Sequence, residues 1–282
     1  MRKLLLVPLM IFLFAASAWA EMNQGLPQVV TDPRQAFVTG SIVVKGEGAA
    51  PTEKKLSAAQ KRIMALRAAK VVALREIAEI LDGVAISGET TVVNAAAESD
   101  TVRATVQGIV KGAQVIKEIY DPLSEMAVVY VTVPMTGPNG IMGQLLPQVI
   151  PLAPPAWPAY QQPLETVQPS NFDGLIIDAR EKPFRPALIN RIVTKNGESI
   201  YDPAKVAQDI LVERGAAEYT NDIGKAKALL GERGSSNPLI IKAEGIVRST
   251  DVEVAPEDAS AIFSSNQSKN YLEGAKVVFV LR

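Results

Sequence analysis

A proline-dense stretch divides this chain into two halves, and it limits the possible folds more than any other feature of the sequence. Nine prolines fall between Pro134 and Pro169. Proline lacks a backbone N–H and favours extended conformations, so we expect no regular packed element there. Trp157 and Tyr160 could anchor the stretch against a neighbour. Residues 135–170 are therefore predicted to be a Pro-rich linker between two domains, with a partner-binding strip as the alternative.

The first twenty residues have the pattern of an export signal. A basic start precedes an apolar run over 4–14, and small residues occupy positions 18 and 20. The run is shorter than the roughly 20 apolar residues that span a bilayer. We expect residues 1–20 to be removed, residues 21–40 to form an extended lead-in, and the mature protein to be periplasmic or secreted. An uncleaved membrane anchor is the alternative.

The composition excludes several kinds of chemistry, because the chain contains no cysteine and no histidine. Disulfides, a cysteine-linked lipid anchor, catalytic triads that need histidine, thiolate or imidazole zinc sites and histidine-ligated haem are all ruled out. Basic and acidic residues nearly balance, at 29 against 30, so nucleic acid is not an expected partner. Ser–Lys dyads, paired carboxylates and oxygen-ligated calcium or magnesium remain.

None of the remaining chemistry has a convincing motif. Asp173 and Asp178 lie five residues apart, on opposite faces of a predicted strand, and Asp178 with Arg180 is better explained as a structural ion pair. Ser57 lacks the lysine of a Ser-x-x-Lys motif and is predicted to cap a helix. Four acidic residues cluster in the sequence but lack the spacing of a calcium-binding loop: Asp251, Glu253, Glu257 and Asp258. We predict no enzyme activity, no cofactor, and no catalytic, cofactor-binding or metal-ligating residues.

The first half, residues 41–134, is predicted to form an α+β domain. A short strand over 41–46 ends at Gly46, and a helix over 57–81 starts with the capping-box pair Ser57 and Gln60. Its apolar positions form two adjoining rows that we expect to face the core. These are Ile63, Leu66, Lys70, Ala73, Ile77 and Leu81, with Met64, Ala68, Val71, Leu74 and Ala78.

The rest of this half is predicted to add one more helix and three strands. A strand over 84–93 is followed by a helix from about Thr101, capped by Ser99 or Asp100. Paired strands then run over 113–120 and 126–133, joined by a turn at 121–124.

The second half, residues 171–282, is predicted to be another α+β domain. Its predicted strands cover 174–180, 238–247 and 275–281, and its helices 203–212, 222–230 and 256–263. Asn196-Gly197 predicts a hairpin with a two-residue type I′ turn. The whole chain is thus expected to be α+β, with two small domains, each with helices packed on a mixed or antiparallel sheet.

Four segments of the first half resemble a known family. They are the helical segment 61–78, the strand 84–91, the Lys-Gly-Ala-containing segment 110–115 and the strand 129–133. Over about 41–134 the chain resembles the envelope lipoprotein domain shared with flagellar proteins P and T. That resemblance implies a non-enzymatic envelope component, and for the flagellar members a ring or disc around the motor. Lipoprotein members carry a lipidated cysteine that is absent here, so a soluble periplasmic member fits better.

The sequence therefore predicts an exported structural or assembly protein of the bacterial cell envelope. Its expected partners are other copies of itself, or envelope or flagellar proteins. Two alternatives remain: a periplasmic adaptor that binds peptidoglycan or a small ligand between its domains, and a hydrolase that uses carboxylates or a Ser–Lys pair.

Overall fold

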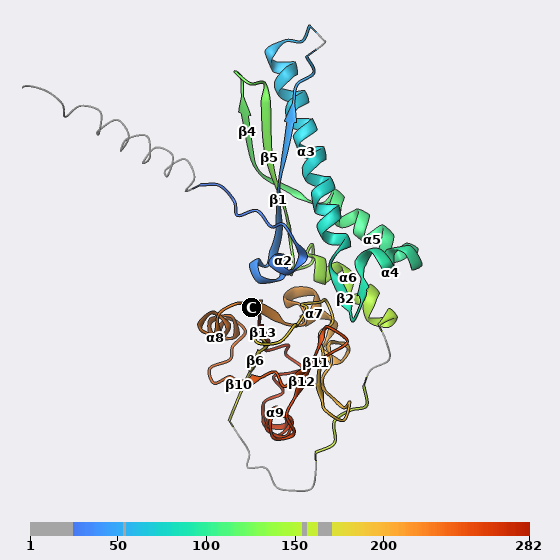
Figure 1. Cartoon of the computed structure of the whole chain (residues 1–282), viewed down its shortest axis with the longest axis vertical. Helices are drawn as coiled ribbons and strands as arrows, with labels where there is room; N and C mark the ends of the chain where they lie inside the picture. The colour runs from blue at the N-terminus through green and yellow to red at the C-terminus, as the bar shows by residue number, and fades with distance from the viewer. Residues whose placement is uncertain (1–24, 53–54, 154–156, 163–170) are drawn as a thin grey trace, which may run out of the picture.

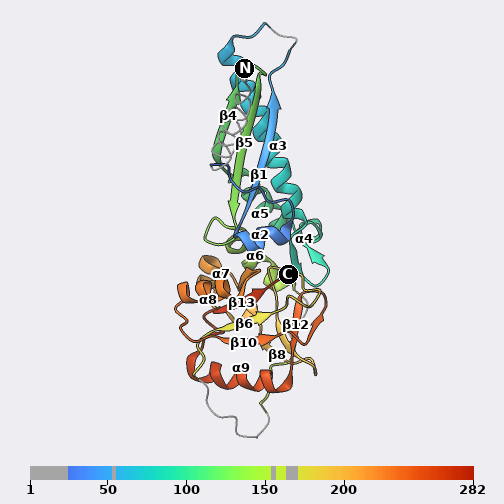
Figure 2. The same cartoon turned by 60° about the vertical axis from the view of Figure 1, so that its left-hand side comes forward.

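A computed structural model describes residues 25–52, 55–153, 157–162 and 171–282. The expected export signal lies outside the described residues. Within them the molecule is elongated: a narrow arm of one long helix and three strands projects from a wider unit that contains the C-terminal half (Figures 1 and 2). The α+β fold class is confirmed.

The arm is a three-stranded antiparallel sheet with one helix on one face. The strand order is β1-β5-β4, where β1 is Ser41–Ala49, β4 is Gln114–Asp121 and β5 is Met126–Pro134. Helix α3, Ala58–Asp82, starts with the predicted capping box, in which the Ser57 hydroxyl accepts from Gln60 N and the Gln60 side chain accepts from Ser57 N. The two paired strands and the capped helix confirm those sequence predictions.

The buried face of α3 matches the predicted one at Ala73, Ile77 and Leu81 but differs from it in the first half of the helix. Ala65, Ala69, Ala73 and Ile77 are buried, whereas Ile63 and Val71 are exposed. The reason lies in β1, which runs past Gly46 to Ala49 instead of ending at that glycine. A Cβ added to Gly46 would lie 2.1 Å from Ala69 O, and one added to Gly48 would lie 2.3 Å from Ala69 N. Two glycines and three alanines thus bring the helix backbone directly against the strand, and in this part of the helix Ile63 and Val71 turn outward.

The expected extended lead-in contains a helix. Helix α2, Pro33–Thr39, is capped by Asp32, whose side chain accepts from Gln35 N, and has proline in its first turn. Before it, Val30 is buried and its N–H donates to Val43 O of β1 at 2.8 Å. The lead-in is therefore packed onto the first domain.

The expected strand over 84–93 is a short hairpin that reaches the second half of the chain. It consists of β2, Ala85–Ser87, and β3, Thr90–Thr91, and is followed by α4, Val92–Glu98, and α5, Asp100–Lys111. Ser99 caps α5 as predicted. Leu188 N donates to Ala85 O and Ile189 N to Ile86 O, at 2.9 and 2.8 Å. Pairing with a distant segment explains why this stretch does not join the arm sheet.

The prediction that the Pro-rich stretch holds no regular element was wrong near its start. Helix α6, Ile141–Val149, with Pro147 inside it, is largely buried, and a 3₁₀ turn, η1, Ile150–Leu152, follows. A Cβ added to Gly143 would lie 2.9 Å from Val212 O, so α6 packs closely on the second half. Burial of its apolar residues offsets the helix-breaking tendency of proline.

The second half contains two four-stranded sheets. The first is entirely parallel, in the order β10-β6-β13-β9, and the second is mixed, in the order β11-β12-β7-β8. The strands of the first are β6, Leu175–Asp178, β9, Glu218–Thr220, β10, Leu239–Lys242, and β13, Val277–Val280. Those of the second are β7, Ile192–Thr194, β8, Ser199–Tyr201, β11, Gly245–Val247, and β12, Asp251–Val254.

Three helices and one 3₁₀ turn accompany these sheets. They are η2, Pro203–Lys205, α7, Gln208–Arg214, α8, Ile223–Glu232, and α9, Pro256–Lys269. Ala226 and Leu230 of α8 pack against Ile176 and Val278 on one face of the parallel sheet, so its central strands are buried on both faces.

Two local predictions for this half need correction. The hairpin β7-β8 forms, but only Gly197 has positive φ, at 75°, whereas a type I′ turn also needs it at Asn196. The expected strand over 238–247 is split between β10 and β11, which belong to different sheets.

Candidate functional site

The carboxylates considered as catalytic candidates serve the fold. Asp173 accepts hydrogen bonds from Ser235 Oγ and from the backbone N–H groups of Ser236 and Asn237. Desolvation acts against these bonds, but together they hold the pKa of Asp173 well below its usual value. Asp178 forms a two-point ion pair with Arg180, with N···O distances of 2.8 and 2.7 Å. This confirms the structural explanation of that pair.

The residues for a metal site or a Ser–Lys dyad are not brought together either. Within the ranges that the structure describes, no three carboxylates are grouped to hold a metal ion, and no serine hydroxyl hydrogen-bonds to a lysine. Asp251 accepts from Trp157 Nε1 instead, and Ser57 caps α3. The absence of enzyme activity stays a prediction.

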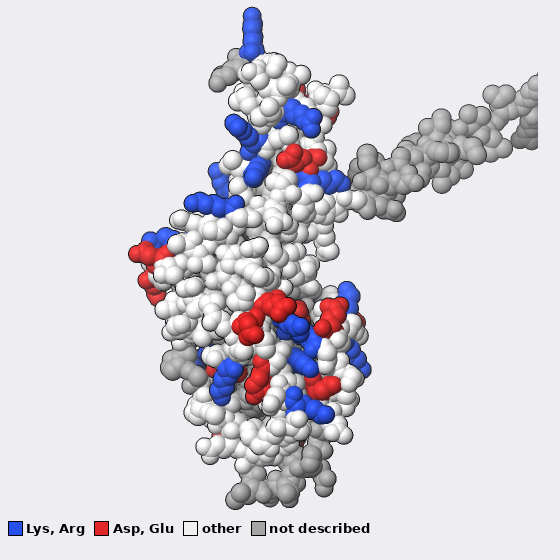
Figure 3. Space-filling view, turned by 180° about the vertical axis from the view of Figure 1, so that it is seen from behind, with Lys and Arg blue, Asp and Glu red and all other residues white. Residues whose placement is uncertain are grey.

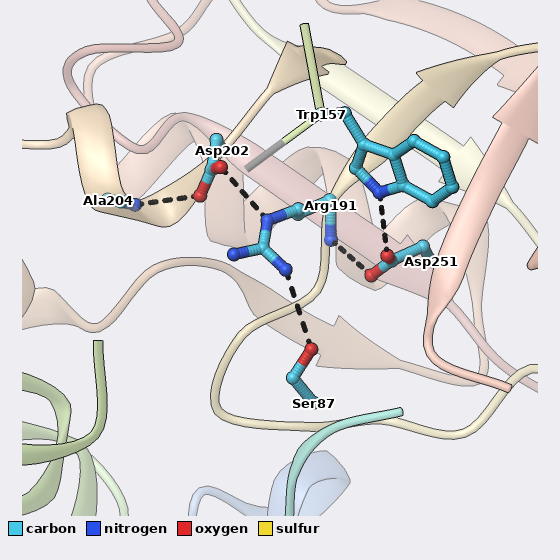
Figure 4. Close-up of polar contacts among 6 residues, drawn as sticks. All are labelled: Ser87, Trp157, Arg191, Asp202, Ala204 and Asp251. Carbon is cyan, nitrogen blue, oxygen red and sulfur yellow. Dashed lines mark hydrogen bonds and ion pairs between the residues drawn. The ribbon is translucent and has the colours of Figure 1, made fainter. Parts of the chain in front are cut away.

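A buried polar cluster of the second half reaches Ser87 of β2, where the two halves of the chain meet (Figure 4). Arg191 Nε donates to Asp202 Oδ2 at 2.9 Å, and both side chains are almost completely buried. Arg191 N donates to Asp251 Oδ1 at 3.2 Å, and Trp157 Nε1 to Asp251 Oδ2, also at 3.2 Å. Burial raises the pKa of Asp251, although the Trp157 bond opposes this. Trp157 therefore anchors its segment, as the sequence predicted.

Contacts across the junction tie the arm to the rest of the molecule. Gly88 N donates to Thr250 Oγ1 at 2.8 Å, and the Phe37 and Tyr219 rings meet edge to face at 4.8 Å. Buried residues of both halves belong to one hydrophobic cluster. The arm is thus held in a fixed direction, with its sheet tip and the start of α3 farthest from the junction (Figures 1 and 2).

The exposed side of the arm helix carries an unusual set of charges. Between Lys55 and Arg75 the chain has no acidic residue. Four exposed cations occupy this part of α3, and we call them the basic helix face: Arg62, Arg67, Lys70 and Arg75. None of the four forms an ion pair with any described residue, whereas Lys61 contacts Glu125 at 2.5 Å. Figure 3 shows Lys and Arg side chains over the arm with few acidic ones among them.

This charge order opposes the helix dipole. Cations are favourable near the C-terminus of a helix and anions near its N-terminus. Helix α3 has the reverse, with its cations at positions up to Arg75 and Glu76, Glu79 and Asp82 at its end. This order of charges therefore does not stabilise the helix, and the stability of the fold does not explain why the cations are there.

Large apolar side chains are exposed beside these cations. Ile63 is 54% exposed and Val71 57% exposed. Helical spacing places Ile63, Arg67 and Val71 in one row along the outer side of α3. The sequence analysis missed this surface because it placed both apolar residues in the core. The alternating Gly46 and Gly48, with alanines at every fourth helix position, were the signal for the true packing face.

These features define an α+β protein with a projecting, positively charged helix and no assembled catalytic site in its described part. Residues 174–282 match a family model described as Treponema pallidum Tp0624, second domain. The matched region begins directly before β6 and covers both sheets of the second half. No curated protein matched the chain.

The comparison overturns the family resemblance stated for the first half. No match to the envelope lipoprotein or flagellar families was found, and the match that was found lies outside residues 41–134. The quoted segments reflect the spacing of core residues in a helix-on-sheet unit, which unrelated proteins share. Among the described residues, no helix is both long enough and apolar enough to cross a membrane.

Proposed function

We propose that this protein is a non-enzymatic assembly protein of the cell envelope that holds a protein partner along its projecting arm. The basic helix face carries the proposal. It presents four cations that form no ion pair with any described residue, next to Ile63 and Val71. Export from the cytoplasm is part of the proposal and depends on the signal-like start of the chain.

The chemistry of the face favours an acidic protein segment. Charge complementarity steers and orients a partner, and exposed apolar side chains supply the buried centre of an interface. A membrane surface is less suitable, because an interfacial helix needs a continuous apolar stripe, and here Arg67 separates Ile63 from Val71. The partner is therefore expected to offer carboxylates on either side of an apolar strip.

A photo-crosslinking experiment in the producing cell tests this function. With a photoreactive residue at Val71, we expect one dominant adduct to a protein, mapped to an acidic segment. The charge reversal Arg67→Glu with Lys70→Glu should reduce the adduct at least about tenfold, since two favourable charge contacts become repulsive. Lys225→Glu with Lys227→Glu, an equal charge change on exposed positions of α8, is the matched control and should leave it unchanged.

Three outcomes would refute the proposal. They are an adduct to lipid, an adduct only to another copy of this chain, and an adduct that survives reversal at Arg67 and Lys70.

A further inference from the structure

A separate cavity lies in the second half, far from the arm. Its volume is about 160 Å³, and it is bounded by the described segment 157–162, which we call the strap, by β8 and η2, and by α9 with the loop after it. An apolar cavity of about 150 Å³ accommodates benzene. The larger apolar side chains of the lining are Tyr160, Ile200, Tyr201, Val206, Phe263 and Leu272. The space therefore suits a single aromatic ring.

The strap is fixed in place, so the cavity is a built feature of the fold. Ser199 N donates to Pro158 O at 2.6 Å, and Tyr160 N donates to Ser199 O at 3.0 Å. The Tyr160 ring meets the Phe263 ring edge to face at 5.4 Å, and its hydroxyl lies 3.0 Å from Ser260 Oγ. The strap thus extends the edge of β8 and is pinned to α9.

One buried hydroxyl in the lining has no partner. Ser199 is 3% exposed, and its Oγ makes no hydrogen bond with any described residue. Buried hydroxyl groups are nearly always hydrogen-bonded, and an exception needs an explanation, such as local strain or a group that binds there. The other buried polar groups of the lining are used: Asp202 by Arg191, and the Tyr201 hydroxyl by Ala216 O.

Two opposite charges lie at the exposed rim. The side chain of Lys205 makes no hydrogen bond or ion pair in the described part of the chain. Among the described residues, the Glu273 carboxylate accepts hydrogen bonds only from Asn266 Nδ2, at 3.2 and 3.3 Å. The cavity therefore combines a positive and a negative group at its rim, an aromatic and aliphatic wall, and a buried hydroxyl.

From this combination we infer that the cavity binds a free aromatic amino acid with a ring hydroxyl, of the size of tyrosine. Lys205 takes the ligand carboxylate and Glu273 its ammonium group. The ring lies against Tyr160 and Phe263, and its hydroxyl satisfies Ser199. This site is independent of the arm, and its failure would leave the proposed partner binding untouched.

Titration of the full-length mature protein, followed by NMR chemical shifts or calorimetry, tests the inference. Tyrosine should bind about fivefold to tenfold more tightly than phenylalanine, which lacks the hydroxyl for Ser199. Tyramine lacks the carboxylate and 3-(4-hydroxyphenyl)propionate lacks the amine, so each should bind at least about fivefold more weakly than tyrosine.

Three variants assign the contacts. Ser199→Ala should abolish the preference for tyrosine over phenylalanine while the protein keeps its melting temperature. Lys205→Gln should weaken the binding of tyrosine but leave the binding of tyramine unchanged. Lys195→Gln, an exposed lysine on the β7-β8 loop outside the cavity lining, is the control and should bind as the parent does.

Several results would overturn the inference. They are no binding of tyrosine at millimolar concentration, equal binding of all four compounds, or a tyrosine preference that persists in Ser199→Ala. The first would mean that the cavity does not hold the ligand, the second that its polar groups do not select it, and the third that Ser199 does not contact the ring hydroxyl.

Discussion

Replacing Gly48 by alanine is expected to lower the free energy of unfolding by about 3 kcal/mol, and Gly46→Ala by a similar amount. The added methyl of Gly48→Ala would lie 2.3 Å from Ala69 N and 2.6 Å from Ala65 O. These are backbone atoms of α3, so no side-chain rotation can relieve the overlap, and the helix must move away from β1. Urea denaturation followed by circular dichroism, with hydrogen exchange of the α3 amides, measures the loss.

Gly108→Ala is the matched control for this prediction. Gly108 lies in α5, has no heavy atom within 4 Å of an added Cβ, and is expected to gain about 0.5–1 kcal/mol as alanine. The double variant at Gly46 and Gly48 should lose less than the sum of the two single losses, because one helix displacement accommodates both methyls. A stability equal to that of the parent in Gly48→Ala would show that α3 does not pack this closely.

Local signals were sufficient to predict much of the fold. The cap at Ser57 and the cap at Ser99 mark their helices because each side chain bonds to a nearby N–H, and no distant residue is involved. The paired strands β4 and β5 were recovered for the same reason, since a short turn at 121–124 joins them.

The remaining features depend on contacts between distant residues. The β2-β3 hairpin pairs with Leu188 and Ile189, and α6 is stabilised by packing on α7, so neither could be recognised from its own sequence. Ile63 and Val71 have the helical spacing of core residues, and only the glycines of β1 decide that alanines are buried instead. The cavity beneath the strap could likewise not be predicted from the sequence, although the anchoring role of Trp157 and Tyr160 was predicted.

Replacing Arg191 by methionine is expected to lower the free energy of unfolding by about 3–5 kcal/mol, because it leaves the Asp202 carboxylate buried without its cation. Arg180→Met removes another Arg–Asp pair, but the Arg180 side chain is 43% exposed, so water can solvate the remaining carboxylate and the expected loss is smaller, about 1 kcal/mol. Urea unfolding followed by Trp157 fluorescence suits both variants, because Trp157 contacts Asp251 of the same cluster.

Removing both charges separates two quantities: the destabilisation caused by a buried carboxylate without a cation, and the net contribution of the ion pair to stability. Arg191→Met with Asp202→Leu should recover most of the loss, since a buried ion pair is often replaced by apolar residues with little net change. A residual deficit of about 1 kcal/mol is expected, because Asp202 also accepts from Ala204 N at 3.0 Å at the start of η2. If Arg191→Met proves no more harmful than Arg180→Met, the buried cluster does not stabilise the junction. The fixed direction of the arm must then depend on apolar contacts such as Phe37 against Tyr219.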